Sequence, residues 1–374
     1  MSVLRFVLLP IILAPVLGMG QAGAEKTLEE QQQAPLLAEP YQGGWSVPPD
    51  ANETKETKSV QLDEAEERSA GSQLDALRWE RNVSLARNAG AIPVQDRAHL
   101  VDLALELNAT APNTFEAHMA NYYTQFPAPA AFEELDLASA KDQRREELIA
   151  PQLANAARKD DKAELMERAK DMKVRGRIAP PLYKVAEDIM SSVEPGAVLF
   201  AAGEMDAYPL WVEQFANGKH TDMLVVDERL LADAAYRKRI WEHTKARGAV
   251  PGEAGFIASL STATDRPIFL SLALGPKALG PLKDKLYVTG LAMRLSHGTV
   301  DNIPLLEARW DRLKKPLDAG PLSKNYLVPG AVLLTHYRAI GDEARASRLE
   351  HELRAMAERL GATSTLVKSG IFQH

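Results

Sequence analysis

The chain has 374 residues, a formal net charge of −7 and no cysteine. Without cysteine it has no disulfide framework, no thiolate metal site and no cysteine nucleophile. Its 44 basic and 51 acidic residues are mixed along the sequence, and no Lys/Arg cluster is interleaved with aromatic residues. This pattern argues against a nucleic-acid partner.

The N-terminus predicts a secretory leader over residues 1–24. A single positive charge precedes a short apolar run, and Ala22-Gly23-Ala24 fits the site that a signal peptidase reads. We therefore expect the mature chain in the periplasm or secreted, with no membrane span after cleavage. An uncleaved membrane anchor is the alternative, but Pro10 and Pro15 interrupt a run that is already short for a span.

Residues 25–71 are rich in Gln, Glu, Pro and Gly and keep no hydrophobic period. This composition predicts a disordered linker, because it buries too little apolar surface to offset the entropy lost on ordering. The alternative interpretation takes the short patch at residues 34–45 as a docking peptide.

Residues 72–194 predict a helical domain. In a first helix, Leu74, Leu77 and Trp79 are expected near one apolar face. Further amphipathic helices follow, the longest over residues 132–157, and a polar turn at 159–161 leads into the next. Helices paired through short polar turns predict stacked αα-hairpins.

The hydrophobic period changes over residues 195–300. Buried strands are predicted by three short apolar runs, at residues 196–203, 221–227 and 266–274. Helices are predicted between them, at residues 208–218 and 228–248. This alternation predicts a right-handed βαβαβ unit with a parallel sheet. Residues 285–296 add another strand or strand pair.

Residues 301–374 predict helices again. The turn at Ile340-Gly341-Asp342 is typical of a tetratricopeptide-like hairpin, although no strict repeat recurs. The predicted fold is therefore an α/β core flanked by N- and C-terminal helical, tetratricopeptide-like layers. The core is a short parallel βαβαβ Rossmann-like unit.

Three acidic residues follow the predicted strands: Glu204 and Asp206 after the first, and Asp227 at the end of the second. Because ligands of parallel sheets bind beyond the carboxyl ends of the strands, we expect these acids to converge on one candidate ligand site. No Gly-rich phosphate loop accompanies them, so the edge favours a divalent cation, sugar hydroxyls or an amine over phosphate. The sequence makes no other cofactor evident.

The same acids also have a structural interpretation. Asp206 precedes Pro209 near a predicted helix start, and Asp227 precedes a Leu-rich segment, so each is a candidate N-cap. A cap stabilises a helix by about 1 kcal/mol. Capping alone and capping with ligand contact both stay open at this point.

Other candidate sites are weaker. The eight histidines fall at no zinc-binding spacing, and no Gly-x-Ser-x-Gly elbow occurs. Trp211, Trp241 and Trp310 occupy amphipathic helical positions, and we expect them in the core rather than on a sugar-binding platform.

Several motifs occur in a fixed order along the α/β region and the C-terminal helices. In chain order they are Asp206-Ala207-Tyr208-Pro209-Leu210-Trp211 with Gln214, Gly218-Lys219 with Asp222, Leu224-Val225-Val226-Asp227, Leu230-Leu231 with Tyr236, Arg266-Pro267-Ile268-Phe269, Gly290 to Leu295, and Gly341-Asp342. In this order they resemble the soluble extracytoplasmic C-terminal region of a bacterial family of multi-pass, glycosyltransferase-like membrane proteins related to protein O-mannosyltransferases.

The resemblance covers about residues 196–360 and implies the fold of that region. Ala207 stands where the family has Thr or Ser. A signal peptide and a helical layer stand in place of the multi-pass domain, in which the transferase chemistry would reside. The resemblance therefore implies a shared module without the activity.

We expect a non-catalytic periplasmic binding or scaffolding protein of the cell envelope, whose helical layers engage an envelope protein that handles glycans. The alternative is a glycan- or sugar-acting enzyme or receptor that uses Glu204, Asp206 and Asp227, with a divalent cation. A purely structural helical adaptor without a small ligand is the third hypothesis.

Overall fold

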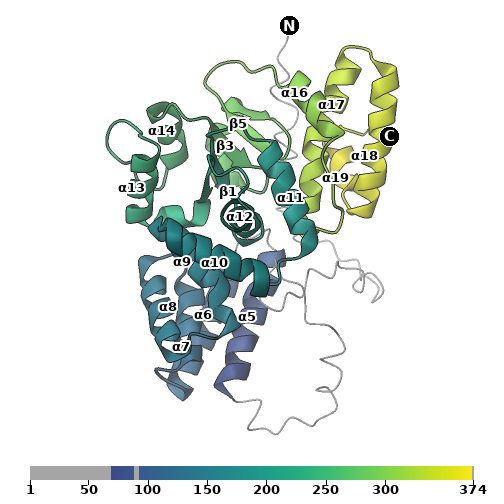
Figure 1. The fold of residues 1–374 in the computed structure, drawn as a ribbon. Helices are drawn as coiled ribbons and strands as arrows, with labels where there is room; N and C mark the ends of the chain where they lie inside the picture. The colour runs from purple at the N-terminus through teal and green to yellow at the C-terminus, as the bar shows by residue number, and fades with distance from the viewer. Residues whose placement is uncertain (1–68, 88–91, 373–374) are drawn as a thin grey trace, which may run out of the picture.

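The structure, a computed structural model, describes residues 69–87 and 92–372. The predicted signal peptide and residues 25–68 of the predicted linker lie outside the described residues. Helices surround one five-stranded mixed sheet (Figure 1), which confirms the predicted α/β core with helical flanks. A continuous cluster of buried apolar side chains extends from Leu74 to Phe372. Among the described helices, none combines the length and apolar composition that a membrane span requires.

The N-terminal helices form the lower layer of Figure 1. They are α5 (Ala70–Arg87), α6 (Val94–Thr110), α7 (Phe115–Gln125), α8 (Pro129–Lys141), α9 (Ile149–Lys159) and α10 (Lys162–Arg175). The predicted turn between the last two is present: Asp160 adopts a left-handed conformation, and the Asp161 carboxylate accepts bonds from two N–H groups of α10. The predicted αα-hairpin at this turn is therefore confirmed.

Two predictions for this layer are wrong. The helix predicted over residues 132–157 ends at Lys141, and a short 3₁₀ turn, η2 (Glu146–Leu148), precedes α9. Pro151 gives the reason, because proline lacks an N–H and is tolerated in the first turn of a helix but not in its interior. Trp79 is exposed rather than packed on the face that buries Leu74 and Leu77.

The sheet has the strand order β2-β1-β3-β5-β4. Its strands are β1 (Val198–Ala201), β2 (Leu224–Asp227), β3 (Ile268–Ser271), β4 (Leu286–Val288) and β5 (Ala292–Leu295). Strand β1 runs parallel to β2 and β3, whereas β5 is antiparallel to β3 and β4. All four residues of β1 are buried, as expected of a central strand that is covered on both faces. The predicted βαβαβ unit and strand pair are confirmed.

Helices and turns pack around this sheet. They are α11 (Pro180–Ser191), α12 (Glu204–Trp211) with a following π-turn η3 (Val212–Ala216), η4 (Glu228–Ala232), α13 (Ala234–His243), α14 (Phe256–Ala263), α15 (Pro276–Leu279) and η5 (Gly280–Lys285). The helix predicted over residues 228–248 is therefore wrong. The chain is extended at Asp233, which separates η4 from α13 and caps α13 with its carboxylate.

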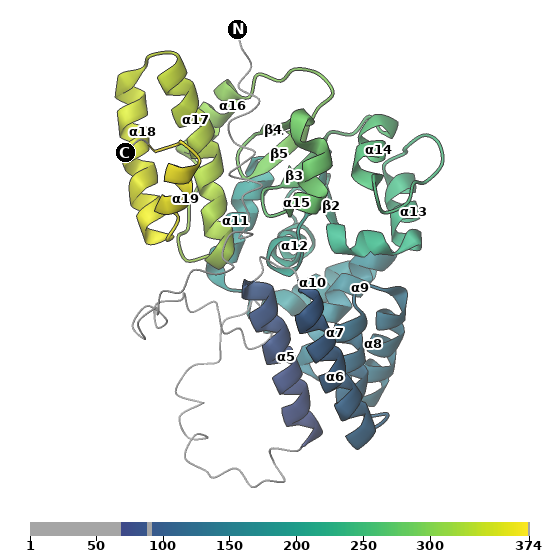
Figure 2. The same ribbon diagram turned by 180° about the vertical axis from the view of Figure 1, so that it is seen from behind.

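The C-terminal helices stand beside α11 (Figures 1 and 2). They are α16 (Ile303–Trp310), η6 (Gly320–Tyr326), α17 (Leu327–Ala339), α18 (Glu343–Arg359) and α19 (Thr363–Lys368). In the predicted turn, Gly341 has φ +73° and Asp342 caps α18. Within α17, a Cβ at Gly330 would lie 2.5 Å from Leu353 and 2.8 Å from Trp310, so only glycine lets the helices approach this closely.

Candidate functional site at the carboxyl edge of the sheet

The structure places the three predicted acids at the carboxyl edge of β1 and β2. Ala201, the last residue of β1, is paired with Asp227, the last residue of β2. Glu204 is the first residue of α12, and Asp206 lies in the same first turn. Asp206 and Asp227 are buried, and Glu204 is nearly so.

Two arginines neutralise two of these acids. Arg229 donates from Nε and Nη2 to the two oxygens of Asp227, at 3.0 and 2.6 Å, and from Nη1 to Glu204 Oε1 at 3.2 Å. Arg81 of α5 donates from Nη2 to the same Glu204 oxygen at 2.7 Å. The pair of Arg229 and Asp227 is bidentate, and bidentate arginine–carboxylate pairs are among the stronger hydrogen bonds between charged groups. The edge is therefore an ion-pair network rather than a bare acidic patch.

Each of the two arginines also contacts an aromatic ring. The Arg81 guanidinium lies 5.2 Å from the centre of the Tyr123 ring, and that of Arg229 lies 4.9 Å from the centre of Phe126. Both contacts are within cation–π range. Burial alone would raise the pKa of Glu204, but the two arginines outweigh it and hold that pKa below its ordinary value. Glu204 therefore stays ionised at neutral pH.

Asp206 has a different environment. Its Oδ2 accepts from the Ala202 N–H at 2.8 Å, and its Oδ1 has no hydrogen-bond partner among the described residues. Burial, with a smaller contribution from Asp227, raises the pKa of Asp206 to about 6, against the Ala202 N–H and the Ser271 hydroxyl, which lower it. Of the three acids, Asp206 therefore has the fewest hydrogen-bond partners among the described residues.

The two acids proposed as caps differ. Asp206 is not an N-cap, because α12 begins two residues earlier and Gly203, at φ +132°, occupies the cap position. Asp227 does cap the turn η4: its Oδ1 accepts from the Arg229 N–H at 3.0 Å. Capping thus accounts for Asp227 and leaves Asp206 without that role.

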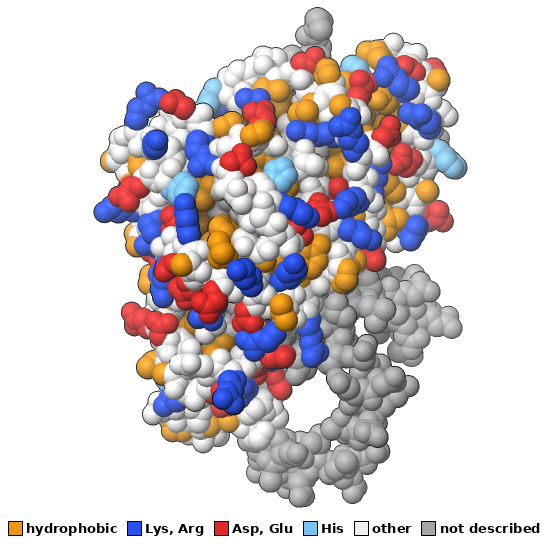
Figure 3. Space-filling view, viewed as in Figure 1, with side chains coloured by type: hydrophobic (Ala, Val, Ile, Leu, Met, Phe, Trp, Pro, Cys, Tyr) orange, Lys and Arg blue, Asp and Glu red, His pale blue; other side chains and the backbone are white. Residues whose placement is uncertain are grey.

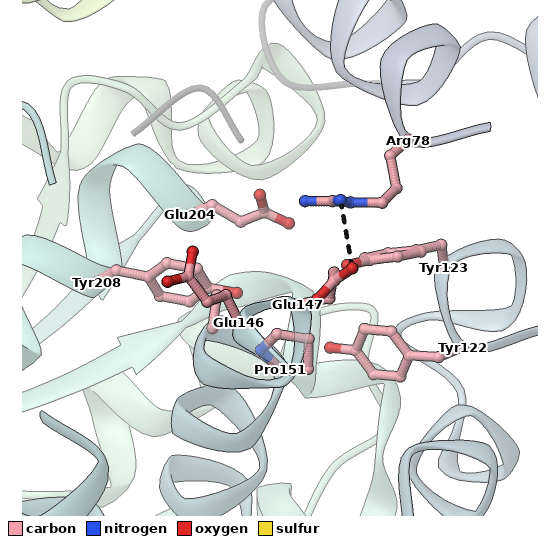
Figure 4. A pocket seen from close by; sticks show the side chains of 9 residues that line it. Arg78, Tyr122, Tyr123, Glu146, Glu147, Pro151, Glu204 and Tyr208 are labelled. Atoms are coloured by element: carbon pink, nitrogen blue, oxygen red, sulfur yellow. Dashed lines mark ion pairs between the residues drawn. The ribbon is translucent and has the colours of Figure 1, made fainter. Parts of the chain in front are cut away.

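A small hollow lies beside this network, between α7, the start of α9 and the start of α12 (Figure 4). It has room for about one water molecule. Its lining residues are Arg78, Tyr122, Tyr123, Glu146, Glu147, Ala150, Pro151, Glu204 and Tyr208. Of the three predicted acids, only Glu204 reaches it. The Tyr122 hydroxyl forms no hydrogen bond with the described residues, and burial raises the pKa of that phenol well above its ordinary value.

Sequence reasoning missed the arginines and tyrosines of this site. Arg229 was within reach, because it follows Asp227 by two residues. Nothing in the sequence predicted the contact of Arg81 with Glu204, because the two residues are 123 positions apart. Within the described part of the chain, no group of three His, Cys, Asp or Glu side chains is placed to hold a metal ion. Trp211, Trp241 and Trp310 are buried, as predicted for core residues.

Comparison with known proteins gives one family match. Residues 182–254 match the TMEM260-associated domain 2, and TMEM260 is an O-mannosyltransferase-related family. The matched stretch runs from α11 to beyond α13 and includes Glu204, Asp206 and Asp227. No curated protein and no solved structure matches the chain.

Proposed function

We propose that the chain is a non-catalytic binding or scaffolding protein of the bacterial cell envelope. In this proposal a signal peptide delivers it to the periplasm or outside the cell. Its central region is a module shared with the extracytoplasmic C-terminal part of glycosyltransferase-like membrane proteins. The observation that supports it best is the arginine-neutralised carboxyl edge, which α5 closes with an Arg81 side chain only 7% exposed.

A catalytic carboxylate has to reach its substrate within hydrogen-bond distance. Both oxygens of Asp227 are already bound by Arg229, and Asp206 is buried within the first turn of α12. The edge instead joins two layers of the molecule. A second ion pair joins the same layers, between Arg158 of α9 and Asp233, at 2.7 Å. This arrangement favours a structural junction over an active site.

The proposed partner is an envelope protein, one that handles glycans. The proposal assigns the contact with this partner to the helical layer, where single apolar side chains are exposed on separate helices. The apolar side chains exposed on helices of this layer include Trp79, Leu137, Met166 and Val174. Basic and acidic groups are interspersed on the face seen in Figure 3, so this face has no broad field of one sign.

The test is a thermal-shift screen of the full chain against divalent cations, sugars, nucleotide sugars and cell-wall fragments, with the Glu204→Gln variant beside the parent. The proposal expects no ligand-induced rise in Tm for either chain. It also expects covalent crosslinking in the periplasm to capture a protein. A compound that raises the Tm of the parent but not of Glu204→Gln would contradict the proposal.

One observation favours a second candidate, a glycan- or sugar-acting enzyme or receptor. The hollow combines tyrosine rings with the carboxylates of Glu147 and Glu204, a mixture that suits sugar rings and their hydroxyls. Removal of the Tyr122 hydroxyl by Tyr122→Phe would then weaken sugar binding by about tenfold, the loss of one hydrogen bond. Isothermal titration of the variant and the parent with the sugar identified in the screen measures that change.

A further inference from the structure

The inner face of α5 is mostly polar. Six of its described side chains are buried, and only Leu74 and Leu77 among them are apolar. The other four are Arg78, Arg81, Asn82 and Ser84. Among the described residues, these two arginines are the only buried basic side chains. The neighbouring helices α6 and α7 bury only aliphatic and aromatic side chains, so α5 differs from the helices on which it packs.

The two arginines connect α5 to the carboxyl edge of the sheet. Arg81 Nη2 donates to Glu204 Oε1 at 2.7 Å, and Arg78 lies 3.9 Å from Glu147 in the wall of the hollow (Figure 4). With α5 in place, the side chain of Glu204 is only 12% exposed. Movement of α5 away from the edge would therefore uncover the Glu204 oxygen that Arg81 binds, together with the hollow that Arg78 lines.

A polar inner face makes a helix easier to detach than an apolar one. Apolar side chains lose their hydrophobic stabilisation when water reaches them. An arginine and its carboxylate instead regain hydration as they separate, and this offsets much of their attraction. Arg81 also keeps its Nε buried with no hydrogen-bond partner among the described residues. Water would satisfy that group on release.

Parts of a protein with few buried apolar contacts open before the rest of the molecule unfolds. We propose that α5 is a releasable lid over the carboxyl edge of the sheet. In the closed state Arg81 occupies Glu204. In the open state Glu204 keeps only Arg229 and faces water, so the group that replaces Arg81 there is a cation, a guanidinium or an ammonium. This inference goes beyond the proposed function, since it concerns access to the edge and requires no envelope partner.

The cysteine-free chain permits a direct test by thiol labelling. Ser84→Cys places a thiol of nearly the same shape on the inner face of α5. Ser323→Cys is the matched control, because Ser323 is a buried serine of η6 in the C-terminal helices. Under native conditions we expect the full-length Ser84→Cys chain to react on the order of a hundredfold faster than the control, because a buried thiol reacts only when opening exposes it. Equal rates would overturn the proposal.

A substitution outside α5 separates release of the lid from fraying of its end. Glu204→Gln removes the charge that holds Arg81 and leaves the sequence of α5 unchanged. Added to Ser84→Cys, it should speed labelling by about tenfold or more, because it leaves the Arg81 charge buried with its partner gone. Added to Ser323→Cys, it should change nothing. If labelling at Ser84→Cys does not respond to Glu204→Gln, the thiol is exposed by local fraying and the lid does not exist.

Amide hydrogen exchange of the unsubstituted full chain supplies a second measurement that needs no variant. Residues 77–83 of α5 and residues 119–124 of α7 both lie in helix interiors. The amides of the α5 stretch should exchange on the order of tenfold faster than those of the α7 stretch, because only α5 is released. Equal protection would mean that α5 opens only together with the layer on which it packs, which contradicts the proposal.

Discussion

Glu204 and Asp206 are two residues apart in sequence, yet the fold gives them opposite electrostatic environments. Glu204 lies between two guanidinium groups, and its pKa is held below the ordinary value. Asp206 has no cationic partner among the described residues, and its pKa rises to about 6 through burial. The sequence predicted that these acids lie at one edge but not this difference, because Arg81 enters from a distant helix.

The Asp206→Asn variant tests the raised pKa. The carboxyl ionises near its ordinary value in the unfolded chain but only near pH 6 in the folded one, so ionisation destabilises the fold. At a pH below both pKa values, the folded and the unfolded one, Asp206 is neutral and this destabilisation is absent. It grows as the pH rises through this window and reaches about 3 kcal/mol above it. Asparagine stays neutral, so the stability of the variant relative to the parent should increase between pH 4 and pH 7.5, with most of the change below about pH 6.

Urea unfolding of both proteins at several pH values measures this difference. The constant effect of the amide group cancels, because only the change with pH is compared. A stability difference that does not change with pH would mean that the folded carboxyl titrates at its ordinary pKa.

At the scale of elements, hydrophobic periodicity located the strands and most helices but missed the breaks. Apolar spacing continues through Pro151 and Asp233, so both predicted long helices crossed a boundary. Local chemistry sets these boundaries: Pro151 fits only the start of a helix, and Asp233 offers a carboxylate to the N–H groups that follow. Pro151 and Asp233 can both be read from the sequence. A prediction that gave helix-start residues more weight than apolar spacing would have ended both helices earlier.

Asp233 combines two roles that substitution can separate. Its Oδ1 accepts from the N–H of Ala235 at 2.7 Å, and its Oδ2 binds Arg158 at 2.7 Å. Asp233→Asn keeps a capping oxygen and loses the charge, whereas Asp233→Ala loses both. We therefore expect Asp233→Ala to lower the free energy of unfolding by about 1 kcal/mol more than Asp233→Asn does. Equal losses in urea unfolding would show that the cap contributes nothing here.

At the scale of the whole molecule, a buried carboxylate ties the C-terminal helices to the α/β core. Asp188 of α11 accepts from the Tyr326 hydroxyl at 2.6 Å and from the Lys314 N–H at 2.8 Å. Both donors precede α17. Burial raises the pKa of Asp188 even though these hydrogen bonds lower it. The buried carboxyl therefore depends on these donors for its hydrogen bonds.

Removal of the Tyr326 hydroxyl should weaken this connection. Tyr326→Phe leaves the ring in place and removes one hydrogen bond to a buried carboxyl, which costs about 1.5–3 kcal/mol. Tyr183→Phe is the matched control, because the Tyr183 hydroxyl forms no hydrogen bond with the described residues. If both variants unfold at the same urea concentration, Asp188 does not hold the C-terminal helices.

The layers of the molecule were predictable from the sequence, and their contacts were not. Changes of hydrophobic period marked where helices give way to strands and return. Nothing local to residues 70–87 indicated that Arg81 reaches the carboxyl edge of the sheet, because the pairing depends on how α5 packs. Two of the acids predicted to form a ligand site, Glu204 and Asp227, also take part, in the structure, in ion pairs at the junction between two layers.

The most direct test of this account is a double-mutant cycle on Arg81 and Glu204, measured by urea unfolding. Arg81→Leu, Glu204→Gln and the double variant should show a coupling energy of about 2 kcal/mol or more, as expected of a pair with little solvent exposure. The exposed pair Lys238–Glu242 is the control and should show a coupling near zero. Additive effects at Arg81 and Glu204, within about 0.5 kcal/mol, would contradict the claim that this edge is a structural junction.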